Sequence, residues 1–323
     1  MVVYGHVIDL SNLESLNTVY RIIYSFHMPL FFLISGYCIG MKKSYGEGKL
    51  LPELKKVFTK LIVPYLVWSA IYIFLSDKLT SPMHHTATLT LRGLAPLWFL
   101  ATLAMCEICF FAIAKAIKKC KPAGQYIILG VIAAASIIIG FTLRILAEKY
   151  DFSTETMTMA GYFIFIAIGR LFISLPSYIL GFIISKTQLI YKFRKIPAFF
   201  VGALFITAVS FIVFLGNLKV NCHLFTTNHY WLFTLTSVLG ALGIMLISYS
   251  VEKIGFGLSY LGQNSLGLMI LHYVPFKTVK YSSVFVSVIW DNEIFISLAA
   301  TAVATAVTMG AIYLVKKKFF IYK

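Results

Sequence analysis

Three histidines lie in or beside strongly apolar stretches of the sequence. His6 stands in GHVID, His27 in SFHMPLFFLISGY and His272 in SLGLMILHYVPF. An ionisable side chain is costly inside a membrane span, so each of these is a candidate either for function or for a buried partner. Imidazole has a pKa that suits proton transfer near neutral pH, and the three rings are therefore candidates for acid–base chemistry.

The stretch around His27 also carries a proline and a serine–glycine pair. Pro29 removes a backbone donor and loosens the helix where His27 lies. Ser35 and Gly36 are small and allow a second helix to approach closely. Two interpretations stay open for His27: a group that takes part in chemistry, or a ring on a kinked helix that faces the wet interface. The other histidines are in connections and are expected to be solvated: His84, His85, His223 and His229.

Glu107 and Arg170 are the ionisable residues expected deepest in the apolar segments. A helical rise of about 1.5 Å per residue puts both near the middle of their spans. They either pair with each other, which lowers the cost of burying two charges, or hold a substrate or phosphate group. No metal site is predicted, because the sequence has no HxxxH or HExxH pattern. It also has no GxSxG or phosphate-binding loop, and its CxxC, Cys106–Cys109, is inside an apolar segment.

The elements that must position these residues are apolar helices. The 323-residue chain is 59% hydrophobic and only 12% charged, with a mean hydropathy of +0.86, whereas a soluble domain has about a quarter charged residues. Segments long enough to cross about 30 Å of hydrocarbon recur along it. We therefore predict an all-α polytopic membrane bundle, a single domain over residues 1–323. Nine spans are expected, at Ile22–Met41, Val57–Ser76, Ala95–Ala114, Tyr126–Ala147, Gly161–Ile184, Ala198–Gly216, Tyr230–Ser250, Gly255–Phe276 and Ile294–Val315.

Lysine and arginine alternate between the connections of these segments. They are concentrated at Lys42–Lys56, Lys115–Lys121, Lys186–Lys195 and Lys316–Lys323. The positive-inside rule puts these connections and the C-terminus in the cytoplasm. The net charge of +16 is then a signal of topology and of contact with anionic lipid, and nucleic acid is not an expected partner.

The same rule makes residues 1–10 the outer end of an earlier span, with Met1 inside the membrane. His6, His27 and His272 then fall at one depth, in the outer half. We expect the three rings to meet there in one pocket.

Five stretches, taken in order, resemble the membrane acyltransferase-three family. They are GHVID (5–9), FHMPLFFLISGY (26–37), PLWFLATLAMCE (96–107), GRLFISLPSYILGF (169–182) and LGQNSLGLMILH (261–272). The resemblance covers essentially the whole chain, and the FHMPLFF form is most similar to the branch related to fucose 4-O-acetylase. It implies ten helices with both ends cytoplasmic, of which this sequence holds nine and the outer end of the first.

The resemblance implies an enzyme that moves an acyl group, usually acetyl, from a cytoplasmic coenzyme A thioester to a hydroxyl of a surface glycan. The proposed catalytic histidine of the family matches His6. The family also has an arginine eleven positions earlier, a position that precedes residue 1 here. Acyl-CoA is the implied co-substrate and a saccharide or lipid-linked glycan the implied acceptor. Membrane lipids and polysaccharide-assembly proteins are the other expected partners, in a bacterial inner membrane.

These residues suggest a mechanism in which His6 takes the proton of a sugar hydroxyl as the oxygen attacks the thioester carbonyl. His27 or His272 orients the acceptor or donates to the developing oxyanion. We expect His6 and His27 to be catalytic and His272 to bind substrate.

Further residues are predicted to bind the two substrates. Trp98, with Tyr37 or Phe99, offers an aromatic face to the sugar, although anchoring at the lipid interface explains a tryptophan there equally well. Lysines at the cytoplasmic side are expected to attract the phosphates of coenzyme A, unless they serve topology alone. They are Lys42, Lys43 and Lys60. Arg170 and Glu107 are expected to meet substrate within the membrane.

Two other functions remain open. Helices with midplane charges and proline-broken spans are also typical of a transporter or flippase for a lipid-linked saccharide. A non-catalytic assembly factor is the second alternative. The sequence shows no inverted repeat, and the ordered motifs favour the enzyme.

Overall fold

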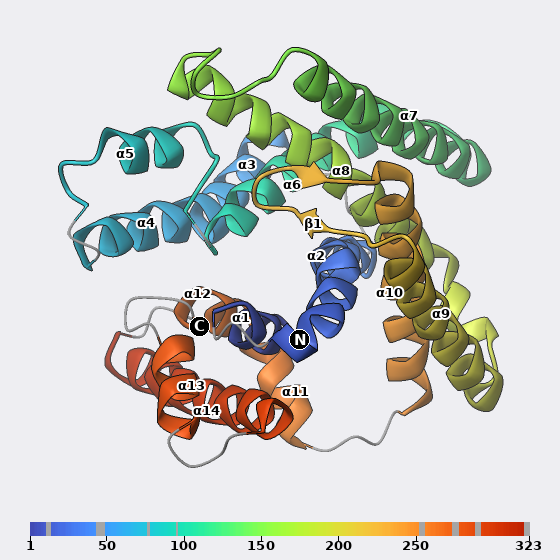
Figure 1. Cartoon of the computed structure of the whole chain (residues 1–323). Coiled ribbons are helices and arrows are strands. Elements are labelled where there is room, and N and C mark those ends of the chain that lie inside the picture. Colours follow the sequence, from blue (N-terminus) through green and yellow to red (C-terminus); the bar gives the residue numbers. More distant parts are fainter. Residues whose placement is uncertain are drawn as a thin grey trace. The chain divides into compact units, whose positions relative to one another are not determined.

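The computed structural model describes residues 1–10, 14–42, 49–75, 78–94, 96–251, 256–272, 278–287 and 292–319. Most of these residues are helical, which confirms the predicted all-α class (Figure 1). The sheet found among them is a short antiparallel hairpin of β1 (Val220–Asn221) and β2 (Thr226–Thr227). The helices are α1 (Val2–Leu10), η1 (Glu14–Leu16), α2 (Asn17–Gly40), α3 (Leu50–Val57), η2 (Phe58–Ile62), α4 (Val63–Leu75), α5 (Pro82–Leu89), α6 (Trp98–Ile117), α7 (Pro122–Lys149), α8 (Met159–Thr187), η3 (Leu189–Lys192), α9 (Lys195–Leu215), α10 (Tyr230–Ser250), α11 (Phe256–Gln263), α12 (Ser265–Leu271), α13 (Thr278–Ser287) and α14 (Glu293–Phe319).

Eight helices of the described residues are long and apolar enough to cross a membrane. Seven of them are α2, α6, α7, α8, α9, α10 and α14, and the eighth joins α3, η2 and α4 over Leu50–Leu75. They match eight of the nine predicted spans, so the chain is a multi-pass membrane protein.

The remaining predicted span, Gly255–Phe276, does not form one long helix in its described part. It consists of the short helices α11 and α12, separated at Asn264. The side-chain amide of Asn264 donates to the carbonyl of Tyr260 at 2.8 Å. A side chain that bonds the backbone of the preceding turn in this way competes with the helical ladder. Gly255 and residues 273–276 lie outside the described residues.

The chain folds as two compact units, each assembled from separate segments. Unit 1 holds residues 1–24, 71–78 and 252–323, and unit 2 holds residues 25–70 and 79–251. Within unit 1, α1 packs against α13 and α14 (Figure 1). Small side chains on α14 let these helices approach closely. The core at this contact is formed by Val7, Val286, Ile296, Ala300 and Ala304.

Helices α2 and α8 cross in unit 2 at two glycines. A Cβ atom on Gly36 would overlap the carbonyl oxygen of Tyr178, and a Cβ atom on Gly181 would overlap that of Leu33. Each helix therefore lays its backbone directly against the other. This confirms the close helix approach predicted at Gly36.

Helix α2 continues through Pro29 without ending there. Because proline has no N–H, the carbonyl of Ser25, four residues earlier, lacks its usual helical donor. The hydroxyl of Ser237, on α10, donates to that carbonyl at 3.2 Å. A neighbouring helix thus supplies the bond that the proline removes, as membrane helices with internal prolines require.

Replacing Ser237 with alanine is expected to destabilise the protein by about 1 kcal/mol, because a buried carbonyl loses a donor. Ser136→Ala is the matched control: Ser136 is equally buried, but its hydroxyl bonds the carbonyl of Ile132 within its own helix. Unfolding of the purified protein by heat or denaturant measures the difference. Equal stability of the two variants would contradict the assignment.

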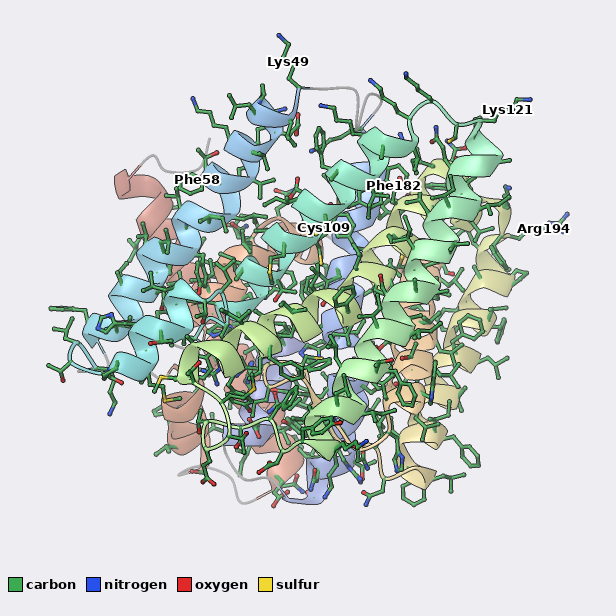
Figure 2. All side chains as sticks on the ribbon, turned by 90° about the horizontal axis from the view of Figure 1, so that it is seen from above. Lys49, Phe58, Cys109, Lys121, Phe182 and Arg194 are labelled. Atoms are coloured by element: carbon green, nitrogen blue, oxygen red, sulfur yellow. The ribbon has the colours of Figure 1, made fainter. Side chains whose placement is uncertain are left out.

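Unit 2 has a basic end, where α2, α6 and α8 end and α7 and α9 begin. The ammonium group of Lys186 donates to the carbonyl of Lys42 at 2.8 Å, which ties the ends of α8 and α2 together. Figure 2 shows Lys49, Lys121 and Arg194 toward this end. We call the opposite end, where α6 begins and the β1–β2 hairpin lies, the far end of unit 2.

Candidate functional site

The first group of predicted site residues lies in unit 1, around His6. The hydroxyl of Tyr24 is 3.1 Å from Nδ1 of His6. The rings of His6 and His272 lie 5.1 Å apart between centroids, tilted by 33°. The predicted meeting of these two histidines, which are 266 positions apart in the chain, is thus confirmed.

Tyr24 is held in place by its neighbours. Its ring stacks on that of Tyr20, one helical turn earlier on α2, with 4.0 Å between centroids. Gly5, next to His6, makes room for it, because a Cβ atom there would lie 2.9 Å from the Tyr24 ring. Tyr24 was not among the site residues predicted from the sequence. The available signals were the two tyrosines at i and i+4 and the glycine just before His6.

The proton position on His272 follows from its hydrogen bond. The ring is fully buried, and its Nδ1 lies 2.7 Å from the carbonyl oxygen of Leu268. A carbonyl only accepts, so Nδ1 carries the proton and Nε2 of the neutral ring is an acceptor. In this state His272 can accept a hydrogen bond from a hydroxyl, but it cannot donate one to an oxyanion through Nε2.

His27 is on α2 within unit 2 and is only 4% exposed. This burial contradicts the interpretation in which the ring faces the wet interface. Its catalytic role stays a prediction.

The second group lies in unit 2, around Arg170 on α8. The guanidinium is fully buried and donates to backbone carbonyls, through Nη2 to Arg92 at 2.6 Å and Leu91 at 3.3 Å, and through Nε to Ile166 at 3.4 Å. It also lies 5.2 Å from the ring centroid of Trp98, a distance typical of a cation–π contact.

Trp98 is buried among protein side chains. It is 6% exposed and stacks on His223 with 6.2 Å between ring centroids. Two of the predicted substrate-binding residues, Trp98 and Arg170, are thus brought together. The alternative of Trp98 as a lipid-interface anchor is not supported, because an anchor exposes its ring to lipid.

The predicted ion pair between Glu107 and Arg170 is wrong. Arg170 lies beside Trp98, the first residue of α6, whereas Glu107 is nine residues further along that helix. At about 1.5 Å per residue the two are separated by more than 13 Å along the axis. The charged groups that act on Glu107 are Lys42, Glu53 and Lys60.

Two of the three predicted coenzyme-binding lysines therefore lie in the electrostatic surroundings of Glu107. Lys42 is exposed just beyond the end of α2, and Lys60 is exposed on η2, a π-helical turn. Single π-turns inside α-helices occur frequently at functional sites. Lys43 lies outside the described residues.

Tyr37 does not share an aromatic face with Trp98, so this prediction is wrong. The Tyr37 hydroxyl bonds the hydroxyl of Tyr191, in η3, at 3.2 Å. That places Tyr37 at the basic end of unit 2, while Trp98 is at the far end. Phe99 is also unsuited to a sugar, because it is 3% exposed and packs against Phe32.

His223 was expected to be solvated in a connection; it lies in the connection, but its ring is half-buried and packs against protein. The β1–β2 hairpin folds onto α8, where the ring of Phe225 occupies the space that a Cβ atom on Gly169 would need. This brings His223 against Trp98 and its Nε2 to 3.4 Å from the carbonyl of Gly93. Burial, and then the charges of Arg170 and Arg92, lower the pKa of His223 to about 3. The ring is therefore neutral near pH 7.

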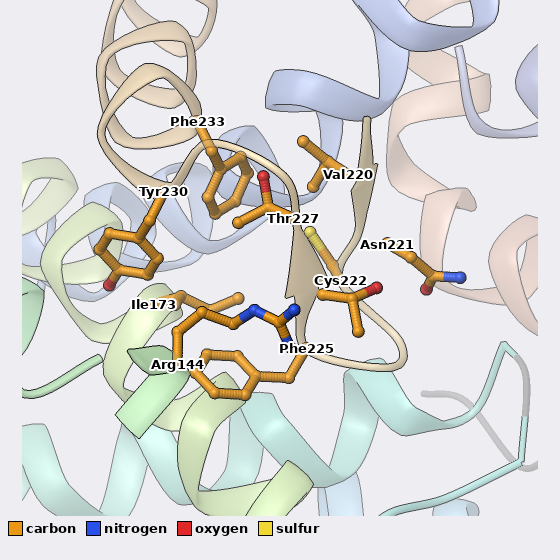
Figure 3. A pocket seen from close by; sticks show the side chains of 10 residues that line it. Arg144, Ile173, Val220, Asn221, Cys222, Phe225, Thr227, Tyr230 and Phe233 are labelled. Carbon is orange, nitrogen blue, oxygen red and sulfur yellow. The ribbon is translucent and has the colours of Figure 1, made fainter. Parts of the chain in front are cut away.

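Behind the hairpin lies a small, partly open pocket between α7, α8 and α10 (Figure 3). Figure 3 shows Arg144 reaching into it beside Phe225. The charge of Arg144 is paired with Glu148 at 2.7 Å. Across the described part of the chain, no three His, Cys, Asp or Glu side chains lie close enough to hold a metal ion.

A family model described as an acyltransferase domain matches residues 1–316, which span both units and every site residue named above. No curated protein and no solved structure matches the chain.

Proposed function

The chain belongs to the membrane acyltransferase-three family, and from this premise we propose that it transfers an acetyl group from acyl-CoA to a hydroxyl of a saccharide. The donor binds at the cytoplasmic face of a bacterial inner membrane, and the acceptor is a cell-surface or exported glycan, free or lipid-linked. The C-terminus is cytoplasmic in this arrangement, as the distribution of lysine and arginine indicates.

The observation that carries the proposal is the contact between His6 and Tyr24. For His6 to act as a base through Nε2, its Nδ1–H donates to the Tyr24 oxygen, 3.1 Å away. A base oriented by a third group is the arrangement that activates hydroxyl nucleophiles in acyl transfer. Nε2 then takes the proton of the sugar hydroxyl.

The reaction follows from that proton transfer. The sugar oxygen attacks the thioester carbonyl carbon, a new C–O bond forms and the C–S bond breaks. Coenzyme A leaves as a thiolate and takes up the proton that His6 has held. The Nε2 acceptor of neutral His272, 5.1 Å away between ring centroids, orients the acceptor through a second hydroxyl.

The donor is assigned to the basic end of unit 2. Lys42 and Lys60 are exposed there, and an ammonium group is a common partner of phosphate. We place the nucleotide phosphates of acyl-CoA at these lysines, together with Lys43. Glu107 lies in the same electrostatic surroundings and limits the net positive charge.

The proposal is tested by label transfer in sealed vesicles that hold the purified full-length chain. Radiolabelled acetyl-CoA is supplied on the side of the basic connections, with saccharide acceptors on the other side. An acyltransferase attaches label to the saccharide in an ester that mild base releases. A transporter or flippase, the rival function, moves saccharide across the bilayer and leaves it unlabelled.

Replacing Tyr24 with phenylalanine is expected to lower kcat by about ten- to a hundredfold, because His6 loses the group that fixes its tautomer and orientation. The stack on Tyr20 keeps the ring in place, so KM and thermal stability stay near those of the natural protein. Tyr126→Phe, on α7, is the control. Wild-type kcat in Tyr24→Phe would remove Tyr24 from the mechanism.

A further inference from the structure

Unit 2 buries two arginines, Arg170 and Arg92, that form no ion pair with a carboxylate among its described residues. Arg170 is the largest side chain among those fully buried, and Arg92 is only 8% exposed. The ion pairs among the described residues are Lys56–Glu53 and Arg144–Glu148. Neither includes Arg170 or Arg92. A guanidinium keeps its charge at every physiological pH, so both are charges held away from water.

Both arginines also have donors that the protein leaves unused. Nη1 of Arg170 and Nε of Arg92 are buried and have no hydrogen-bond partner within the described part of the chain. The carbonyl oxygens of Leu91 and Arg92 accept from Nη2 of Arg170 and not from Nη1. Buried donors are rarely left unpaired in folded proteins, and charged ones least of all. The site therefore has the donors and the charge for an anion.

The guanidinium groups of Arg92 and Arg170 lie one after the other along one face of α8, although Arg92 itself belongs to the turn before α6. The Arg92 guanidinium lies 4.4 Å above the ring of Phe163. Phe163 precedes Arg170 by seven residues, so the two share a face of α8 and are separated by about 10 Å along its axis. Arg92, nearer the start of α8, is slightly exposed and Arg170 is fully enclosed. Arg92 is thus the less enclosed of the two guanidinium groups.

The geometry of the turn before α6 fixes Arg92 relative to Trp98. Gly93 has φ +70°, and a Cβ atom there would lie 2.7 Å from the Cα atom of Trp98. Only glycine fits this position without displacing the helix start. The β1–β2 hairpin covers the group from the other side, with neutral His223 against Trp98. The hairpin, residues 220–227, adds hydrogen-bonding groups and contains no carboxylate.

We propose that Arg170 and Arg92 bind an oxyanion of the acceptor, a carboxylate on an acidic sugar or a phosphate that links a glycan to its lipid. Arginine suits both, because its planar fork matches the oxygens of carboxylate and phosphate. The assignment to the acceptor rather than to acyl-CoA rests on the proposed function, which puts the far end of unit 2 on the outer side. Anionic acceptors are then favoured over neutral ones.

The test is equilibrium binding to the purified full-length chain in the absence of acyl donor. Glucuronate and inorganic phosphate are titrated separately, with sodium chloride at equal ionic strength as the reference. We expect saturable binding of at least one, weakened about ten- to a hundredfold in Arg92→Gln and in Arg170→Lys. Tighter binding of glucuronate identifies an acidic sugar, and tighter binding of phosphate identifies the lipid-linked group.

Arg144→Gln is the matched control, because Arg144 is another arginine with a buried, unpaired Nε, but its charge is paired with Glu148. It is expected to bind as the natural protein does. If Arg170→Lys does not fold, Arg92→Gln decides, since Arg92 is less completely buried than Arg170. Binding no stronger than in chloride, or equal binding by Arg92→Gln and the natural protein, overturns the proposal.

The result is separable from that of the vesicle assay. Label transfer to saccharide without oxyanion binding overturns this inference and leaves the acyltransferase proposal intact. Oxyanion binding without label transfer supports this inference and contradicts the acyltransferase proposal.

Discussion

Replacing His6 with alanine is expected to lower acetyl transfer by about two to four powers of ten, the usual contribution of a general base. The alternative base in the described part of unit 1 is His272, whose Nε2 is also an oriented acceptor because its Nδ1 donates to the carbonyl of Leu268. His6 is preferred because the His272 ring is fully buried, whereas His6 is more open to a substrate hydroxyl. His6 is partly exposed, so the variant loses little packing and is expected to fold.

The measurement is the initial rate of label transfer at equal amounts of folded protein. His85→Ala is the control, since His85 is exposed on α5 and is expected to contribute nothing to the reaction. Two results would be inconsistent with the mechanism: a His6→Ala rate near that of the natural protein, or an equal loss in His85→Ala.

Alanine at Gly36 or Gly181 is expected to give the largest loss of stability of any single methyl group added to α2 or α8. The new carbon would overlap a carbonyl oxygen of the facing helix. Backbone atoms cannot move aside as a flexible side chain can, so the helices must separate along the crossing. Overpacking of this kind costs about 1–3 kcal/mol, and more where the surroundings are rigid.

The control for this pair is Gly130→Ala on α7, where a Cβ atom meets nothing within 4 Å. Alanine there is expected to be neutral or to stabilise the helix by about 0.5–1 kcal/mol. Thermal unfolding of the purified variants measures both effects. If Gly36→Ala and Gly181→Ala are as stable as Gly130→Ala, then α2 and α8 do not cross as described.

The spans were predictable because length and apolar character alone identify them. The segment Gly255–Phe276 has the same overall character as the others, yet it is broken where the amide of Asn264 bonds the preceding turn. A local side-chain hydrogen bond of this kind competes with the helical backbone bonds, and hydropathy does not report it. The β1–β2 hairpin was missed for a similar reason, since it is held by Phe225 against Gly169 rather than by a local pattern.

The sequence predicted how far along its span each candidate residue lies, but not which neighbouring helix its side chain faces. Counting from the ends of the spans correctly brought His6 and His272 together. It failed for Glu107 and Arg170: both lie within their spans, but the Arg170 guanidinium lies beside Trp98, nine residues before Glu107 on α6. Tyr24 was missed because its role depends on which way α2 is turned toward α1, and a mostly apolar helix carries little information about its rotation.

The most direct test of the account is an experimental structure of the full-length protein with a saccharide acceptor and an unreactive acyl-CoA analogue bound. We predict an acceptor hydroxyl within about 3 Å of Nε2 of His6, the reach that a general base requires, with Tyr24 still bonded to Nδ1. An acceptor seated with every hydroxyl beyond the reach of His6 would contradict the central claim.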